Sequence, residues 1–190
     1  MIPQKTRLVF MVRMRFAGVS PRKSWLQVAM ILPRRLPGHP RLLKVERFAP
    51  RYAATGLSLA PGAMPPEAWV LADGARLEQV LDNLLVNALR YVPSGGHVTL
   101  SLTQVQASRA RWRLVIRDDG PGLPADELPR VFERFYRGSA PRGALDASTN
   151  GSGLGLAIVR EIVERHGGEV RARSASPHGL EIELDLLAIA

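Results

Sequence analysis

Four polar side chains of the kind that bind metal ions and phosphate are spaced along one predicted helix. They recur at i, i+4, i+7 and i+8, as Asn83, Asn87, Arg90 and Tyr91. This spacing places them on one face of an α-helix. Amide oxygens suit a hard, partly hydrated Mg²⁺, and a guanidinium suits phosphate oxygens. The alternative interpretation is two solvated asparagines on a surface helix, and the helix alone does not decide between the two.

The helix is predicted from apolar residues that recur every three or four positions: Leu77, Val80, Leu81, Leu84, Leu85 and Ala88. Asp73 stands where an N-cap residue would. One face is therefore expected to be buried, and the polar face is left for a ligand or for solvent.

A carboxylate is expected at the end of a strand further along the chain. Residues 111–117 alternate, and one face of this strand carries Trp112, Leu114 and Ile116. Counting by two places Asp118 on the same face. Gly120 and Gly122 follow at once, a pattern that an ordinary turn would also explain.

A glycine-rich run opens a second predicted helix. It consists of Gly151, Ser152, Gly153, Leu154, Gly155 and Leu156. A glycine loop that leads into a helix N-terminus presents backbone N–H groups and the positive end of the helix dipole to an anion such as phosphate. The run is not a Gly-x-x-x-x-Gly-Lys-Ser/Thr loop, because no Lys follows Lys44, and no strand directly precedes it as a dinucleotide fold requires.

Taken together, these elements resemble the ATP-binding domain of sensor histidine kinases, a branch of the ATPase superfamily shared with gyrase-type topoisomerases. The polar helix, the Asp-x-Gly-x-Gly turn at 118–122, an aromatic run at 131–137 and the glycine run occur in the family's order, over about residues 47–190. The resemblance implies an α+β, Bergerat-type fold: a two-layer α/β sandwich with a mixed sheet, helices on one face and an ATP lid. Residues 138–150, rich in Gly, Ser, Ala and Pro, suit that lid.

The resemblance also implies two ligands, ATP and Mg²⁺, and roles for individual residues. Asn87 would ligate Mg²⁺, Arg90 would contact phosphate, and Asp118 would accept a hydrogen bond from the adenine amino group. Phe132 and Phe135 would anchor the base of the lid. The full set of expected ATP-binding residues is Asn83, Asn87, Arg90, Tyr91, Asp118, Gly120, Gly122, Phe132, Gly151, Gly153, Leu154, Gly155 and Leu156.

One departure from the superfamily bears on the reaction. Relatives that hydrolyse ATP, and those that phosphorylate serine on an anti-sigma antagonist, carry a Glu four residues before the Mg²⁺ asparagine. Here that position is Asn83, and an amide cannot take a proton at neutral pH. A histidine-kinase-type domain is favoured, because imidazole is already nucleophilic and needs no strong base.

A phosphoacceptor histidine is not recognisable in this sequence. In the family the acceptor lies on a dimerising helical hairpin, and none of the four histidines resembles it: His39, His97, His166 and His178. The expected partner is thus a histidine-bearing hairpin, or a response regulator, on another chain. The alternatives are a nucleotide-binding regulatory module without turnover and a serine kinase of the anti-sigma type.

The basic charge of the chain, +9 in total, is concentrated at its N-terminus. Residues 1–45 hold ten Lys or Arg and no acid, whereas residues 46–190 hold sixteen Arg and seventeen acids. The first segment alternates weakly from Leu8 to Phe16 and then breaks at several prolines, so no stable fold is assigned to it. It could be a basic arm touching a membrane or nucleic acid, a remnant of a preceding domain, or a product of a wrongly chosen start or shifted reading frame.

Composition excludes several classes of function. The absence of cysteine excludes disulfides, thiolate metal sites and cysteine nucleophiles. No apolar run approaches the roughly 20 residues that a membrane helix needs. We expect two parts: a basic segment at 1–45 and an ATP-binding domain at 46–190. The protein is expected to be cytoplasmic and monomeric, and no nucleic-acid partner is expected.

Overall fold

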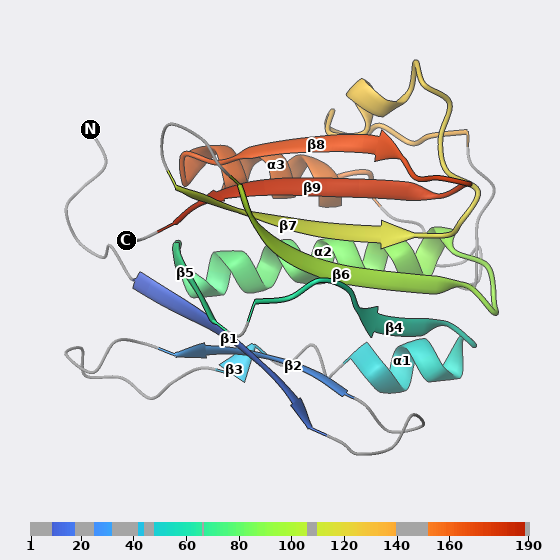
Figure 1. The fold of residues 1–190 in the computed structure, drawn as a ribbon. Helices are drawn as coiled ribbons and strands as arrows, with labels where there is room; N and C mark the ends of the chain where they lie inside the picture. The colour runs from blue at the N-terminus through green and yellow to red at the C-terminus, as the bar shows by residue number, and fades with distance from the viewer. Residues whose placement is uncertain are drawn as a thin grey trace.

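The computed structural model describes residues 9–17, 25–31, 42–43, 48–65, 67–105, 110–139 and 152–188, and their strands form two sheets (Figure 1). Two predicted features lie outside these residues: the greater part of the expected lid at 138–150, and Gly151.

The larger sheet has five strands in the order β4-β6-β7-β9-β8. The strands are β4 (Ser58–Pro61), β6 (His97–Val105), β7 (Arg111–Asp118), β8 (Glu169–Ser174) and β9 (Leu180–Leu187). β4 pairs with β6 in parallel and the other neighbours pair antiparallel. The predicted mixed sheet is confirmed.

Two helices cover one face of this sheet (Figure 1): α2 (Gly74–Tyr91) and α3 (Gly155–Arg165). A shorter helix, α1 (Ala49–Ala54), contacts β4, and the single turn η2 (Leu128–Arg130) precedes the aromatic run. Alternate strand residues such as Val98, Leu100 and Leu184 are buried in one apolar cluster with the inner side of α2. The predicted two-layer arrangement is therefore confirmed.

Helix α2 begins and packs as its sequence pattern predicts. The Asp73 side chain accepts a hydrogen bond from the Arg76 backbone N–H at 3.1 Å, which caps the first turn. All six apolar residues that defined the period are buried. Because this face is held by the core, the direction of the polar face is fixed as well.

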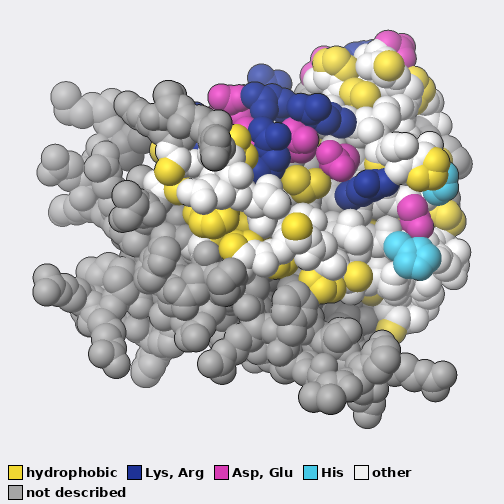
Figure 2. All heavy atoms as spheres, in the orientation of Figure 1, with side chains coloured by type: hydrophobic (Ala, Val, Ile, Leu, Met, Phe, Trp, Pro, Cys, Tyr) yellow, Lys and Arg dark blue, Asp and Glu magenta, His cyan; other side chains and the backbone are white. Residues whose placement is uncertain are grey.

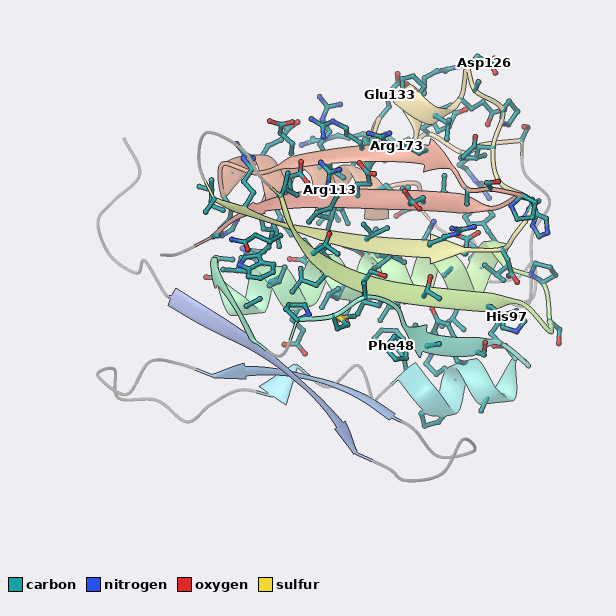
Figure 3. All side chains as sticks on the ribbon, in the orientation of Figure 1. Phe48, His97, Arg113, Asp126, Glu133 and Arg173 are labelled. Atoms are coloured by element: carbon teal, nitrogen blue, oxygen red, sulfur yellow. The ribbon has the colours of Figure 1, made fainter. Side chains whose placement is uncertain are left out.

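The outer face of the sheet carries paired charges (Figures 2 and 3). Arg113 on β7 donates to both carboxylate oxygens of Asp185 on β9, at 2.7 and 2.8 Å. Arg173 on β8 lies 3.2 Å from the buried carboxylate of Glu183. These contacts cover the polar side of the sheet and leave the apolar side for the helices.

The N-terminal segment contributes strands, although no stable fold was expected for it. β1 (Val9–Ala17), β2 (Trp25–Ile31) and β3 (Leu42–Leu43) join β5 (Glu67–Leu71) in the order β3-β2-β1-β5. The weak alternation had marked the place of β1. Its pairing with β5, for example Val9 with Leu71, joins residues more than 50 positions apart, which a local pattern does not reveal.

None of the helices within the described ranges combines the length and hydropathy that crossing a bilayer requires.

Candidate functional site

The polar face of α2 forms one wall of a cavity of about 490 Å³. All four side chains singled out by their spacing line it: Asn83, Asn87, Arg90 and Tyr91. The structure thus gathers the predicted residues of this helix at one site. Val86, one turn after Asn83, also lines the cavity and adds an apolar surface beside the amides.

Two of these side chains contain buried donors that no described residue satisfies. They are Nδ2 of Asn83 and Nε of Arg90. Buried polar atoms in proteins are nearly always paired, so unpaired ones beside a cavity call for a partner that enters it. Both atoms donate hydrogen bonds, and the partner must therefore offer acceptor oxygens or nitrogens.

Asp118 lies at the end of β7, where the period-two count placed it, and it also lines the cavity. Its Oδ1 accepts hydrogen bonds from the backbone N–H groups of Gly120 at 3.0 Å and Leu180 at 3.1 Å. No described residue bonds to Oδ2, so this oxygen is left for a ligand. Burial raises the pKa of Asp118 above the ordinary carboxyl value, outweighing the two hydrogen bonds that lower it.

The neighbouring carboxylate, Asp119, forms hydrogen bonds within the protein. It accepts from the His97 backbone N–H at 2.7 Å and lies 2.9 Å from His97 Nδ1, which ties the turn after β7 to the start of β6. Although burial acts to raise the pKa of Asp119, its hydrogen bonds with His97 outweigh that effect and lower the pKa. Asp119 braces the hairpin, whereas Asp118 faces the cavity.

The glycine run forms another wall of the cavity. Its described residues all line the cavity: Ser152, Gly153, Leu154, Gly155 and Leu156. Gly153 has a φ of +68°, and a Cβ there would lie 2.8 Å from the Phe135 Cα, so only glycine fits. Helix α3 starts at Gly155, and the positive end of its dipole therefore lies at the cavity.

Three expected residues stand differently in the structure. Phe132 is buried in the core and does not line the cavity, and Gly120 is buried behind Asp118, supporting its carboxylate. Phe132 and Phe135 were both expected to anchor the base of the lid, and the structure separates them, because the side chain of Phe135 is 69% exposed. Phe135 has a φ of +64°, which turns its side chain outward, and its backbone N–H donates to the Gly153 carbonyl at 3.0 Å. The backbone at this position, rather than the aromatic ring, joins the two segments.

Part of the cavity lining had no predicted role. Five of these residues lie within motifs that had been recognised: Val131, Tyr136, Arg137, Gly138 and Ser152. The others, besides Val86, are Pro121, Leu123, Ile158 and Leu180. Leu180, in contrast, reaches the cavity only because β9 pairs beside β7.

The donor set fits Mg²⁺ only in combination with ligand oxygens. The described residues contain no group of three or more His, Cys, Asp or Glu side chains that could hold a metal ion. Asn87 offers one amide oxygen in the cavity. Mg²⁺ is commonly held by one or two protein oxygens together with phosphate oxygens and water, and this arrangement meets that pattern.

Comparisons with known proteins agree with this geometry. Residues 72–188 match the family described as histidine kinase-, DNA gyrase B-, and HSP90-like ATPase. The histidine-protein kinase/phosphatase MprB of Mycobacterium tuberculosis is 46% identical over 110 residues, which cover 58% of this chain and 20% of MprB. The histidine-protein kinase BaeS of Escherichia coli is 40% identical over 139 residues, covering 73% of this chain and 28% of BaeS. The chain spans about a fifth to a quarter of the length of these relatives.

Solved structures give the same result. A mycobacterial sensor histidine kinase MprB structure superposes with a TM-score of 0.65 at 35% identity, covering 76% of this chain and 90% of that one. Full-length ShkA, solved in complex with AMPPNP, gives 0.61 at 31% identity and covers 76% of this chain and 29% of its own. This chain belongs to the histidine kinase-, DNA gyrase B- and HSP90-like ATPase family, and its ATPase domain is of the histidine-kinase type.

Proposed function

We propose that residues 46–190 bind ATP together with Mg²⁺ and act as the catalytic domain of a two-component sensor histidine kinase, whose acceptor histidine lies on another chain. One observation carries the proposal. The cavity has unpaired donors on α2 and the start of α3 on its walls, and an acceptor oxygen of Asp118 beside them. A nucleoside triphosphate needs both kinds of group.

Each wall would hold a different part of the ligand. Oδ2 of Asp118 accepts a hydrogen bond from the adenine amino group. Arg90 and the N–H groups of the glycine run bind phosphate oxygens, and Asn87 contributes its amide oxygen to Mg²⁺. When bound, Mg²⁺ would neutralise part of the negative charge that develops on the phosphate oxygens.

The residues of the cavity favour transfer to an imidazole over hydrolysis. Asp118 is the one carboxylate among the described residues that line it, and Asn83 occupies the place where a general base would stand. An imidazole nitrogen attacks the γ-phosphorus without a base, a P–N bond forms, and the bond to the ADP oxygen breaks. The same observation disfavours the serine-kinase alternative, since a hydroxyl must lose its proton.

The described histidines are poor candidates for the acceptor. Both ring nitrogens of His166 are engaged: Nε2 accepts from the Asp73 N–H at 3.1 Å, and Nδ1 bonds to the Ile162 carbonyl at 2.7 Å. His97 starts a strand and His178 lies in a turn, whereas His39 lies outside the described residues. The proposed partners are therefore a histidine-bearing dimerisation hairpin and, downstream, a response regulator in the cytoplasm.

A transfer assay tests the proposal. The chain is incubated with γ-labelled ATP, Mg²⁺ and the separately produced helical hairpin of a similar sensor kinase. Label is expected on the hairpin as an acid-labile phosphoimidazole. A hairpin with its acceptor His replaced by Gln should remain unlabelled. The wild-type hairpin should be labelled more slowly by the chain variant Asn87→Ala than by the wild-type chain. Label on the Gln hairpin would contradict transfer to histidine.

A second candidate is a nucleotide-binding regulatory module without turnover. Asn83 supports this candidate, because its amide cannot act as a general base. A cavity without a general base can bind ATP and leave water unactivated. ATP binding of normal strength combined with no transfer to hairpins from several similar kinases would favour this candidate over the kinase.

A further inference from the structure

The turn between β8 and β9, residues 175–179, lies directly behind the carboxylate that faces the cavity. The first residue after it, Leu180, donates its backbone N–H to Oδ1 of Asp118 at 3.1 Å. His178 Nδ1 lies 3.3 Å from the Gly120 carbonyl, and the Arg117 guanidinium donates to the Ser176 carbonyl. The residues on both sides of Asp118 are thus tied to this turn.

The packing between the turn and Asp118 is backbone against backbone. Gly179 has a φ of +111°, and a Cβ at this position would lie 1.9 Å from the Asp118 carbonyl oxygen and 3.0 Å from the Asp119 Cα. No side chain fits there without moving the turn. Likewise, a Cβ on Gly122 would lie 2.8 Å from the Gly179 carbonyl oxygen, so the loop after Asp118 rests on the same residue.

This packing determines which carboxylate oxygen the ligand meets. Two backbone N–H groups, those of Gly120 and Leu180, converge on Oδ1 and hold the carboxylate plane in one orientation. Oδ2 is then the acceptor presented to the cavity. An ionised carboxylate oxygen accepts from an amino group and repels a carbonyl oxygen, so its direction discriminates between purines that differ at this one position.

We propose that the turn at 175–179 sets the base specificity of the site, with Gly179 and His178 as positioning residues that act through Asp118. The inference rests on the proposed nucleotide binding. Discrimination between a 6-aminopurine and a 6-oxopurine is thereby assigned to His178 and Gly179. Neither residue is among the described residues that line the cavity.

A pair of glycine substitutions isolates the effect. Gly179→Ala introduces both a left-handed alanine and a collision with the Asp118 backbone. Gly95→Ala is the matched control: Gly95 has a φ of +88°, but a Cβ there meets nothing within 4 Å. The two variants therefore share the conformational strain, and only the first displaces the turn.

The measurement is the dissociation constant for two β,γ-imido nucleotides, one with adenine and one with hypoxanthine. The wild type should prefer the adenine nucleotide by about tenfold or more, as expected for a hydrogen bond to a charged group. In Gly179→Ala this ratio should fall towards one, whereas Gly95→Ala should keep it. His178→Ala should lower the ratio by a smaller factor while its melting temperature stays near that of the wild type.

Asp118→Asn tests the orientation directly. Its amide oxygen would still accept from the two backbone N–H groups, which directs the NH₂ group into the cavity as a donor. The preference should then reverse in favour of the 6-oxopurine. In the double variant Asp118→Asn, Gly179→Ala, the reversal should be lost because the turn no longer selects one orientation.

The outcomes separate this inference from the function on which it rests. If the wild type binds neither nucleotide, the proposed function and this inference are both rejected. If the wild type binds and discriminates, but Gly179→Ala weakens both nucleotides by the same factor, the turn has only a structural role and the inference is overturned. Should Gly179→Ala fail to fold, an unchanged ratio in His178→Ala overturns it equally.

Discussion

The two ends of the cavity are built in opposite ways. At the α2 end, the donors Nδ2 of Asn83 and Nε of Arg90 are buried without partners among the described residues. At the β7 end, two backbone N–H groups donate to Oδ1 of Asp118, and Oδ2 is left free among the described residues. One end is completed by the ligand, and the other is organised before the ligand arrives. We expect the first to supply charge-dependent affinity and the second to supply specificity.

The largest predicted effect is at the organised end. Asp118→Ala removes the acceptor for the base and leaves two backbone N–H groups unpaired. Affinity for a non-hydrolysable ATP analogue should fall about 10- to 100-fold, the range of a hydrogen bond to a charged group. Calorimetric titration measures it. Because the phosphate end is untouched, the remaining binding should still strengthen when Mg²⁺ is added.

Asn87→Ala should give the complementary result. In the presence of Mg²⁺ the affinity should fall about tenfold, because one protein ligand of the ion is lost. In the presence of a chelator the variant and the wild type should bind equally. Gln79→Ala, on the same helix but outside the cavity, serves as the control. An equal loss of affinity with and without Mg²⁺ would show that Asn87 does not ligate the ion.

The comparison extends to the two faces of the sheet. The partly buried carboxylate of Asp118 and the buried carboxylate of Asp185 should change the stability of the protein with pH in opposite directions. On the inner side, burial raises the pKa of Asp118, so its ionisation disfavours the folded state at pH values above the ordinary carboxyl pKa, near 4. Asp118→Asn should therefore unfold at a higher denaturant concentration than the wild type at pH 7. The advantage should disappear as the pH falls below 4.

On the outer face, the hydrogen bonds from Arg113 lower the pKa of Asp185, outweighing the effect of burial. A lowered pKa contributes stability that is present above the ordinary value and is lost as the pH falls through the folded-state value. Asp185→Asn should destabilise the protein at pH 7 and flatten the loss of stability below pH 4. Denaturant unfolding followed between pH 2 and 7 provides the measurement, and parallel curves for variant and wild type would contradict it.

The smallest predicted effect concerns a buried support of α2. The Tyr52 hydroxyl donates to the Leu85 carbonyl at 2.9 Å, and neither residue lines the cavity. Tyr52→Phe should lower the free energy of unfolding by about 1 kcal/mol, the usual value for one such hydrogen bond. Nucleotide affinity should stay unchanged. A clear loss of affinity would show that the α2 wall is less firmly held than the core packing indicates.

The parts of the site that could be predicted from sequence are those set by local periodicity. The spacing from Asn83 to Tyr91 and the position of Asp118 at a strand end follow from helix and strand geometry, and the structure places them at one cavity. The exposure of the Phe135 side chain could not be predicted, because its direction depends on a positive φ that the sequence does not signal. The contact from Leu180 to Asp118 spans 62 positions and depends on sheet pairing, so no local pattern contains it.

The same distinction applies to the fold. The mixed sheet and its two covering helices follow from alternation, apolar spacing and glycine positions. The β1 and β5 pairing does not, because nothing in residues 1–45 indicates which edge they would join. The division at residue 46 therefore stays a prediction, and deletion of the N-terminal segment followed by nucleotide titration tests it.

The most direct test of nucleotide binding at this cavity is calorimetric titration of the chain with a non-hydrolysable ATP analogue, with and without Mg²⁺. We expect saturable one-to-one binding, with a dissociation constant on the order of micromolar in Mg²⁺ and weaker binding in a chelator. Absence of binding under both conditions, in protein whose melting curve shows a folded domain, would contradict this expectation.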